Sequence, residues 1–338
     1  TIISESSLVA TTITFVVFFY EVFEDSGFDL VVFDEVSQSS IAHTLPVACL
    51  GRKVLYAGDY KQLAPIVKSK YKIAKEWLNK TVFDIRNIKK MPFFTFLNEQ
   101  SRMTDMICQI VSRSFYDNLL TVSRDAEGNH QWLQERQIVS MEKYKDDPVI
   151  FIKVEDKSFW TSSGMIRLSS ANEIALLAQE LVMKGTNQKD ILILTPFHSQ
   201  RILITRELKK KMLKHIDVST VHKSQGSERH TIIIDPVMAD SDFFQDNEKM
   251  FEQLLNVAIS RAKARMIFLY HDDDLDNKTV QKLFFVYDQI RNPIKHYHPI
   301  QNYLSNGMFL DSVIGSNVSY LDFQLHITGI SDSKLHAI

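Results

Sequence analysis

The chain has 338 residues, of which 45% are hydrophobic and 24% are charged, and its formal net charge is −2. This balance is ordinary for a globular protein long enough for two domains, and it excludes binding of nucleic acid or membranes through overall charge. Two cysteines, Cys49 and Cys108, exclude a disulfide framework and a paired-cysteine zinc site. We therefore expect a reducing, intracellular compartment, either cytoplasmic or nuclear/nucleoid. The most apolar stretch, residues 13–20, is too short to span a bilayer, so we expect no membrane partner.

Two adjacent carboxylates, Asp34 and Glu35, follow the first strand that the sequence predicts. The apolar run 28–33 suits a buried parallel strand, and ligands bind at the carboxyl ends of such strands. Two neighbouring carboxylates repel each other, and a hard cation would relieve that repulsion while leaving one of them free as a base. The alternative is a strand followed by a solvated acidic turn.

The first third of the chain alternates between strand and helix patterns. Residues 7–10 are interpreted as a strand end before Thr11 and Thr12, whose hydroxyls are also typical of turns. Further strands are predicted at 53–57 and 94–97, and helices at 37–50, within 71–88 and at 104–116. Gly58 permits a tight turn, and Asp59 and Gln62 would lie beside the acidic pair if the two strands are neighbours. The alternative there is a polar Gly/Pro loop.

The same alternation returns after a polar, mixed segment at 117–147. Strands are predicted at 149–153, 191–194, 231–235 and 265–270, and helices at 172–184, 201–214 and 249–262. This order indicates an α/β fold with two parallel-sheet layers. The run Lys209–Lys211 is typical of a solvated helix face. The aromatic tail from about residue 272, which includes Tyr297, Tyr303 and Phe309, carries no chemistry that we can assign.

Six segments, taken in order, resemble a superfamily 1 helicase. They are D-E-V-S-Q at 34–38, G-D-Y-K-Q-L-A-P at 58–65, Q-S-R-M at 100–103, T-P-F-H-S-Q at 195–200, S-T-V-H-K-S-Q-G-S-E at 219–228 and N-V-A-I-S-R-A-K at 256–263. The third and sixth resemble the up-frameshift-like (1B) branch, whose members move 5′ to 3′. The fifth resembles RecD-type DNA helicases, which favours DNA over RNA as the strand.

The resemblance implies two RecA-like P-loop NTPase domains, with ATP in the cleft between them. Residues 1–116 would be the C-terminal part of the first domain, 117–148 a linker, 149–271 the second domain, and 272–338 a tail. The activity implied is that of an ATP hydrolase that moves along single-stranded DNA or RNA, with ATP and Mg²⁺ as cofactors. Opening and closing of the cleft would drive the steps.

The resemblance also assigns roles to individual residues. Asp34 would hold Mg²⁺, Glu35 would polarise the attacking water, and Gln62 would sense the γ-phosphate. Arginine fingers on the transferring phosphate would be Arg102 and Arg261. The other nucleotide-binding positions would be Gln38, Gly58, Asp59, Gln100, Gly226 and Glu228. The positions that contact the nucleic-acid strand would be Thr11, Thr12, Thr195, Ser219, Thr220 and Lys223.

Two departures from the family pattern qualify this interpretation. No G-x-x-x-x-G-K-[S/T] phosphate loop occurs in the sequence, so we interpret the chain as the C-terminal part of a longer helicase that should not hydrolyse ATP well alone. Its first partner would then be the missing N-terminal part. Ser101 stands where the branch has a tyrosine that packs on the base, so another ring replaces it or base selectivity is relaxed. Two alternatives remain, a non-catalytic nucleic-acid-binding module and a nucleotide-switched scaffold.

Overall fold

The computed structural model describes residues 2–85, 87–224, 226–237 and 248–292. The chain divides into two units at residue 281, and the elements below belong to the first unit, apart from α12 (Lys278–Arg291), which runs across the division. Within the described ranges, no helix is both long enough and apolar enough to cross a bilayer.

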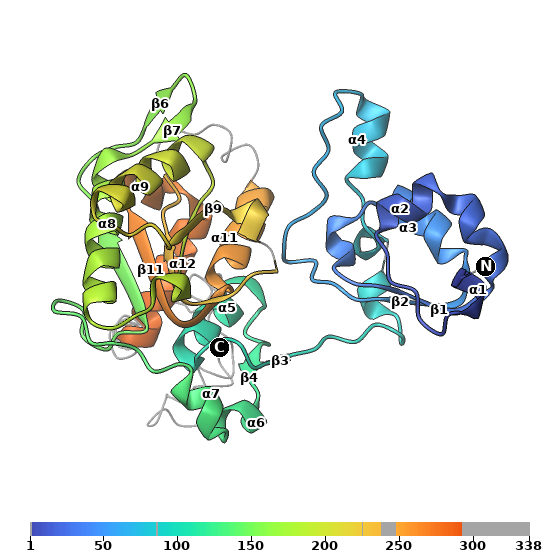
Figure 1. Ribbon diagram of the computed structural model, residues 1–338, viewed down its shortest axis with the longest axis horizontal. Coiled ribbons are helices and arrows are strands. Elements are labelled where there is room, and N and C mark those ends of the chain that lie inside the picture. Colours follow the sequence, from blue (N-terminus) through green and yellow to red (C-terminus); the bar gives the residue numbers. More distant parts are fainter. Residues whose placement is uncertain (1, 86, 225, 238–247, 293–338) are drawn as a thin grey trace, which may run out of the picture. The chain divides into compact units, whose positions relative to one another are not determined.

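A five-stranded parallel sheet forms the larger core, in the order β5–β11–β10–β8–β9 (Figure 1). Its strands are β5 (Val149–Lys153), β8 (Ile191–Thr195), β9 (Asp217–Thr220), β10 (Arg229–Ile234) and β11 (Ala262–Tyr270). The connecting helices are α8 (Leu168–Met183), α9 (His198–Lys210) and α11 (Glu248–Ile259). Every residue of β8 is buried, as expected of a central strand with both faces covered. Helix α8 covers the sheet with a stripe at helical spacing that includes Ile174, Leu177 and Leu181.

A smaller two-stranded parallel sheet pairs β1 (Phe28–Phe33) with β2 (Gly51–Tyr56). Helices α2 (Ile13–Phe18) and α3 (Ile41–Ala48) supply its neighbours. Its core holds Val16, Phe23, Phe33, Val36 and Val47. Several side chains of β1 and β2 lie outside this core, and Leu30 and Val32 are 51% and 55% exposed.

The remaining elements are short. Helix α5 (Asp105–Phe115) lies between β3 (Glu99–Gln100) and β4 (Thr121–Val122), which pair with each other. Its buried face and its terminal Asp105 and Arg113 match an amphipathic helix with favourable end charges. The other short helices are α1 (Ile2–Glu5), α4 (Lys72–Leu78), α6 (Arg124–Glu127) and α7 (His130–Gln134). Strands β6 (Phe159–Thr161) and β7 (Gly164–Ile166) form an antiparallel hairpin. The structure also has 3₁₀ turns at Tyr20–Val22, Glu24–Ser26, Val36–Gln38, Val82–Asp84, Ile88–Lys90, Gln188–Asp190, Val221–Ser224 and Asp272–Asp276.

The predicted α/β class with parallel sheets is confirmed, and the strands predicted at 28–33 and 149–153 match β1 and β5. The strand predicted at 94–97 is wrong, because no described strand pairs with these residues and β3 begins only at Glu99. Residues 7–10 likewise form no strand. The segment predicted as a linker contains β4, α6 and α7. The tail aromatics Tyr297, Tyr303 and Phe309 lie outside the described residues.

Candidate active site

The acidic turn after β1 has an unusual backbone conformation. Glu35 has φ 52° and ψ 37°, a left-handed conformation that is costly for a residue with a Cβ atom and that clusters at functional sites. The Glu35 amide donates to Asp34 Oδ1 at 2.9 Å, and Gln38 Nε2 donates to Glu35 Oε2 at 3.2 Å. All three side chains are exposed. The turn therefore presents two carboxylates to solvent in a fixed arrangement.

The loop after β2 packs closely on this turn. The Val36 amide donates to Ala57 O at 3.0 Å. A Cβ atom on Gly58 would lie 3.0 Å from the amide nitrogens of Val36 and Ser37, so only glycine fits without a shift of the backbone. The Asp59 carboxylate accepts from the Lys61 amide and from Gln62 Nε2, both at 2.9 Å. These bonds fix the orientation of the Gln62 amide.

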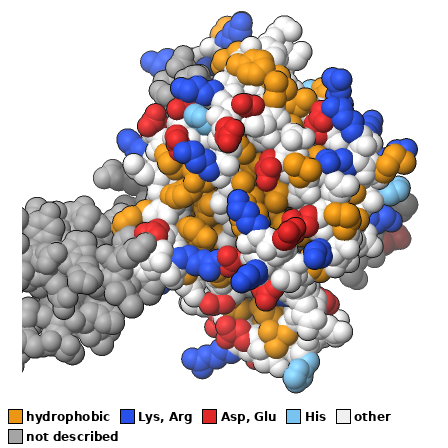
Figure 2. Space-filling model, turned by 90° about the vertical axis from the view of Figure 1, so that its left-hand side faces the viewer, with side chains coloured by type: hydrophobic (Ala, Val, Ile, Leu, Met, Phe, Trp, Pro, Cys, Tyr) orange, Lys and Arg blue, Asp and Glu red, His pale blue; other side chains and the backbone are white. Residues whose placement is uncertain are grey.

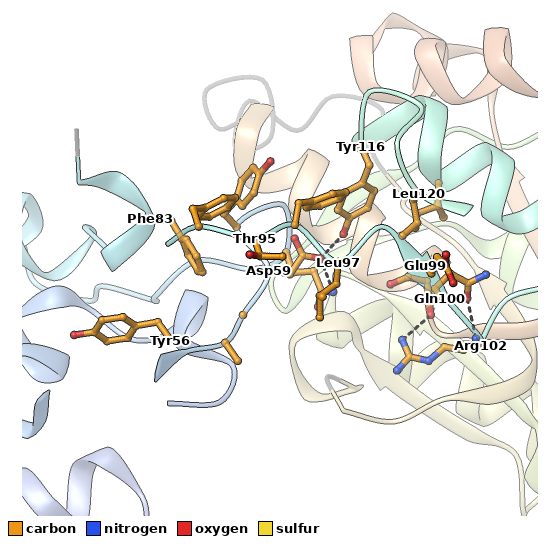
Figure 3. Close-up of a pocket in the computed structure, with 18 of the residues that line it drawn as sticks. Tyr56, Asp59, Phe83, Thr95, Leu97, Glu99, Gln100, Arg102, Tyr116 and Leu120 are labelled. Carbon is orange, nitrogen blue, oxygen red and sulfur yellow. Dashed lines mark hydrogen bonds between the residues drawn. The ribbon is translucent and has the colours of Figure 1, made fainter. Parts of the chain in front are cut away.

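A pocket of about 980 Å³ lies beside this loop. Six of the predicted nucleotide-site residues line it, namely Gly58, Asp59, Gln62, Gln100, Arg102 and Glu228. Aromatic side chains complete the lining, among them Phe96. Figure 3 labels two others, Phe83 and Tyr116. The hydroxyl of Tyr116 donates to Asp59 and so connects the end of α5 to this loop (Figure 3). The pocket combines apolar walls with a few convergent polar groups, as small-molecule sites do.

Glu228 lies between two cations at this pocket. Arg102 Nε donates to Glu228 Oε2 at 2.5 Å, and Lys263 Nζ lies 2.8 Å from Glu228 Oε1. The hydrogen bond from Lys263, followed by that from Arg102, lowers the pKa of the Glu228 carboxyl below its ordinary value. Arg102 also donates to the Ser260 carbonyl at 3.2 Å. Arg102, the predicted arginine finger, and Glu228, a predicted nucleotide-binding residue, are therefore bonded to each other.

Arg261 and Gln62 meet directly, although they are 199 positions apart. Arg261 Nη2 donates to Gln62 Oε1 at 3.2 Å, and Arg261 is almost fully buried. Burial, and then the neighbouring Arg102 charge, lower the pKa of the Arg261 guanidinium. Asn256 Nδ2 bridges the same elements, because it donates to Lys61 O and to the Tyr116 hydroxyl, both at 2.9 Å. Asn256 opens the N-V-A-I-S-R-A-K segment, whereas no sequence signal points to Tyr116.

An indole ring lies beside Ser101, where the branch has its tyrosine. Trp132 Nε1 donates to the Ser101 carbonyl, and the guanidinium of Arg136 stacks 4.0 Å from the centroid of the Trp132 ring. Arg136 also donates to the carbonyls of Ser101 and Arg102, each at 2.9 Å, and lines the pocket. Sequence reasoning missed both residues. Their acceptors are backbone carbonyls, which leave no signature in the sequence.

The remaining predicted residues, which include Glu35, Gln38 and Arg261, are not among those that line this pocket. Thr11 and Thr12 are exposed and line a separate cavity of about 610 Å³ together with Asp34. The register of β8 with β9 pairs Leu194 with Ser219 and Thr195 with Thr220. The Thr195 hydroxyl is buried and has no hydrogen-bond partner among the described residues, whereas Ser219 and Thr220 are half-buried. Lys223 and Gly226 are exposed.

Asp34 is the residue predicted to hold the metal. Among the described residues, no group of three or more His, Cys, Asp or Glu side chains is placed to hold an ion. A single exposed carboxylate at the end of a strand nevertheless fits Mg²⁺, which keeps most of its waters and takes one or two carboxylates besides substrate phosphates.

Parallel sheets and this pocket define an α/β protein with a candidate nucleotide site. A family profile described as "AAA domain" matches residues 78–273, more than half of the chain, and a second with the same description matches residues 1–70. The chain belongs to this AAA-domain family and is a superfamily 1 helicase relative.

Curated relatives agree with this assignment. An uncharacterized ATP-dependent helicase of Methanocaldococcus jannaschii is 30% identical over 77% of this chain and 38% of its own length. The DNA polymerase alpha-associated DNA helicase A of Schizosaccharomyces pombe is 29% identical over 71% of this chain and 36% of its own length. The chain thus spans little more than a third of either relative. The structure of an arterivirus nonstructural protein 10 helicase with DNA is 13% identical over 75% of this chain and 42% of its own, at a TM-score of 0.38, which is too low to support an argument.

Proposed function

We propose that these residues form part of an ATP-dependent helicase or translocase with two RecA-like domains, the first represented here by its C-terminal part. ATP would be bound and hydrolysed at the pocket beside Gln62 and Arg102, and the enzyme would move along single-stranded DNA or RNA. Membership of a helicase family supports the class of activity. These 338 residues by themselves should hydrolyse ATP poorly, because they contain no phosphate loop.

The contact between Arg261 and Gln62 is the main observation behind this proposal. A fixed planar cation bonded to a glutamine amide is a pair that a γ-phosphate could separate by bonding to both. At the same pocket Arg102 is bonded to Glu228, and a phosphate could take the place of that carboxylate on Arg102, because an ionised carboxylate accepts hydrogen bonds and cannot donate one to phosphate. Arrival of a nucleotide would therefore exchange protein–protein bonds for protein–phosphate bonds. A module that only binds nucleic acid has no need for such a set.

Each residue has a distinct role in this scheme. Glu35 would polarise the attacking water, Gln62 would orient and report the γ-phosphate, and the two arginines would stabilise charge on the transferring group. Mg²⁺, when bound with the nucleotide, would neutralise phosphate charge, with Asp34 as its protein ligand. The ring beside Ser101 that belongs to Trp132 would take part in holding the base. Thr11, Thr12, Ser219, Thr220 and Lys223 would contact the nucleic-acid backbone.

The test is ATP hydrolysis by the natural protein that contains these residues, with and without single-stranded oligonucleotide. We expect Glu35→Gln to lower turnover by about 10²-fold or more, because a general base contributes about that much. Arg261→Lys should lower it by about 10³-fold while nucleotide binding weakens far less, since lysine keeps the charge but loses the planar fork. The matched control is Glu24→Gln, an exposed carboxylate on another turn. Strand-independent hydrolysis, or equal losses in Glu24→Gln and Glu35→Gln, would contradict the proposal.

A further inference from the structure

An exposed tryptophan meets a half-buried phenylalanine on the five-stranded domain, and neither residue lines the nucleotide pocket. Trp160 of β6 is 55% exposed, and its ring meets Phe197 edge to face with 5.9 Å between centroids. We call these two side chains the aromatic shelf. Figure 1 places the β6–β7 hairpin at the top edge of this domain, and Figure 2 shows hydrophobic side chains exposed at the top of its view. Tryptophan is highly buried on average, so the exposed indole of Trp160, like that of Trp77, leaves apolar surface open to a partner.

The shelf is held rigidly by the start of α9. The Ser199 hydroxyl donates to the Met165 carbonyl of β7 at 2.7 Å. Met165 pairs with Trp160 in the hairpin register and is fully buried, so its side chain lies beside the exposed ring on the same face of the hairpin. Gly164 at the hairpin turn has φ +123°, and a Cβ atom there would lie 2.8 Å from Ser199 Oγ. Close approach of the hairpin to α9 thus depends on this glycine, and the indole is positioned in advance rather than left on a free loop.

The position of the shelf continues the proposed path of the nucleic-acid strand. Phe197 follows β8 by two residues, since β8 ends at Thr195. The same register that pairs Thr195 with Thr220 places the end of β9 alongside. The half-buried hydroxyl residues Ser219 and Thr220 therefore lie at the sheet edge from which the shelf projects. A nucleic-acid strand bound at those hydroxyls would reach the aromatic shelf next.

Cations continue from the shelf along α9. His198 Nε2 and Arg201 Nη2 lie 3.0 Å apart in the first turn of α9. A groove of about 630 Å³ follows, and it is lined by Arg201, Ile202, Thr205, Arg206, Lys209 and Lys210. Glu207 neutralises Lys210 at 2.7 Å, whereas no described carboxylate pairs with Arg206 or Lys209. The groove is therefore complementary to a polyanion.

We propose that the aromatic shelf stacks bases of a single-stranded nucleic acid while Arg201, Arg206 and Lys209 hold the phosphates that follow. Flat rings beside a cationic groove are the combination that binds single strands without sequence preference. An acidic peptide would use the charges and have no need of the rings, which is why we assign the surface to nucleic acid. This inference rests on the proposed function, since it extends the strand path of the same enzyme.

The test uses the 338-residue chain and two oligothymidylates, one with a central 2-aminopurine and one with abasic residues at its centre. Stacking on an indole should quench the 2-aminopurine emission on binding. We expect Trp160→Leu to abolish this quenching and to weaken binding of the base-containing strand about tenfold, in line with the loss of one stacked base. Trp160→Phe, which keeps a ring, should restore most of the affinity. Affinity for the abasic strand should be the same in all variants.

The matched control is Phe159→Leu. Phe159 is 47% exposed on the same strand, but alternation places it on the opposite face of the hairpin from Trp160. This variant should bind both strands as the unsubstituted chain does, and thermal melting of each variant checks that it folds. The proposal would be overturned if Phe159→Leu weakened binding as much as Trp160→Leu does. It would also be overturned if Trp160→Leu weakened binding of the abasic strand as much as binding of the base-containing strand.

Other outcomes separate this inference from the proposed function. If Lys223→Ala lowers the affinity for oligothymidylate and Trp160→Leu does not, the result would support binding of a nucleic-acid strand and overturn the role of the shelf. Tighter binding of poly-glutamate than of oligothymidylate, with the same dependence on Trp160, would show that the surface takes acidic protein and would also overturn it. No binding of either oligonucleotide by the 338-residue chain would overturn the shelf, whereas the proposed function is tested by strand-stimulated hydrolysis in the natural protein.

Discussion

The two parallel sheets of this chain begin from similar sequence patterns and end in different environments. Strand β8, I-L-I-L-T, is buried at every residue, whereas Leu30 and Val32 of β1, F-D-L-V-V-F, are more than half exposed. Strand β8 has β10 on one side and β9 on the other, with helices packed over the sheet. Strand β1 pairs only with β2 among the described strands. A continuous apolar run therefore predicts a strand, while its neighbours decide whether that strand is buried.

The two sheets also carry different residues of the candidate site. The acidic turn at Asp34 and Glu35 projects from the smaller, less covered sheet, while Arg261 follows α11 of the large, fully packed domain. Residues on a rigid core are held precisely, and residues on a less packed element move more easily. A site with contributions from both can change its geometry when a ligand binds. The predictions that follow measure how unequal the two regions are.

We expect the largest loss of stability from a substitution in a buried ion cluster of the large domain. Arg167 is fully buried and donates to both oxygens of Asp274 at 2.8 and 2.7 Å, and it lies 3.8 Å from Asp235. Burial raises the pKa of Asp235, and the Arg167 charge opposes this rise. Arg167→Met should lower the free energy of unfolding by about 3–5 kcal/mol, because it leaves buried carboxylates unpaired.

The control for this prediction comes from the smaller sheet. Arg52 and Asp29 form an ion pair at 3.6 Å, but both side chains are more than 80% exposed. Arg52→Met should therefore change stability by about 1 kcal/mol or less. Urea unfolding followed by circular dichroism measures both variants. Equal effects would show that the buried cluster is not held by its charges.

A matched leucine substitution compares the two sheets directly. Leu194 is fully buried in β8, and Leu30 is 51% exposed in β1. Leu194→Ala should cost about 2–5 kcal/mol, since it removes buried methyl groups and leaves a cavity. Leu30→Ala should cost about 1 kcal/mol or less. If Leu30→Ala proves as costly, then β1 is covered in solution, and the contrast between the two sheets would disappear.

Periodicity predicted the elements that pack against many neighbours. The helix predicted at 172–184 corresponds to α8, which begins four residues earlier at Leu168, and the strand predicted at 191–194 falls short of β8 by one residue. The prediction failed at 94–97, where an alternating aromatic run has the pattern of a strand but no partner strand. Hydrogen-bonded neighbours come from distant parts of the chain, so a local pattern cannot supply them.

The candidate site was predictable as a set of segments but not as a set of contacts. The motifs named Gln62, Arg102, Glu228 and Arg261, and the structure joins them in two bonded pairs. Which residue pairs with which depends on how two sheets and α11 come together, and no spacing in the sequence fixes that. Likewise, the apolar pattern of β8 predicts its strand, but only the packed sheet reveals that the hydroxyl of Thr195 is buried.

We expect the smallest loss of stability from a substitution of Glu228, whose ion pairs join Arg102 to the large domain. Because Lys263 and Arg102 lower the folded-state pKa of Glu228, its contribution to stability is complete above the ordinary value near 4.5. That contribution is lost as the pH falls through the lowered pKa. At neutral pH, Glu228→Gln should therefore lower the melting temperature slightly, by an amount typical of a part-exposed ion pair. At a pH well below the lowered pKa, the two proteins should melt together. A difference that persists unchanged in acid would mean that the Glu228 side chain stabilises the fold by packing and not by its charge.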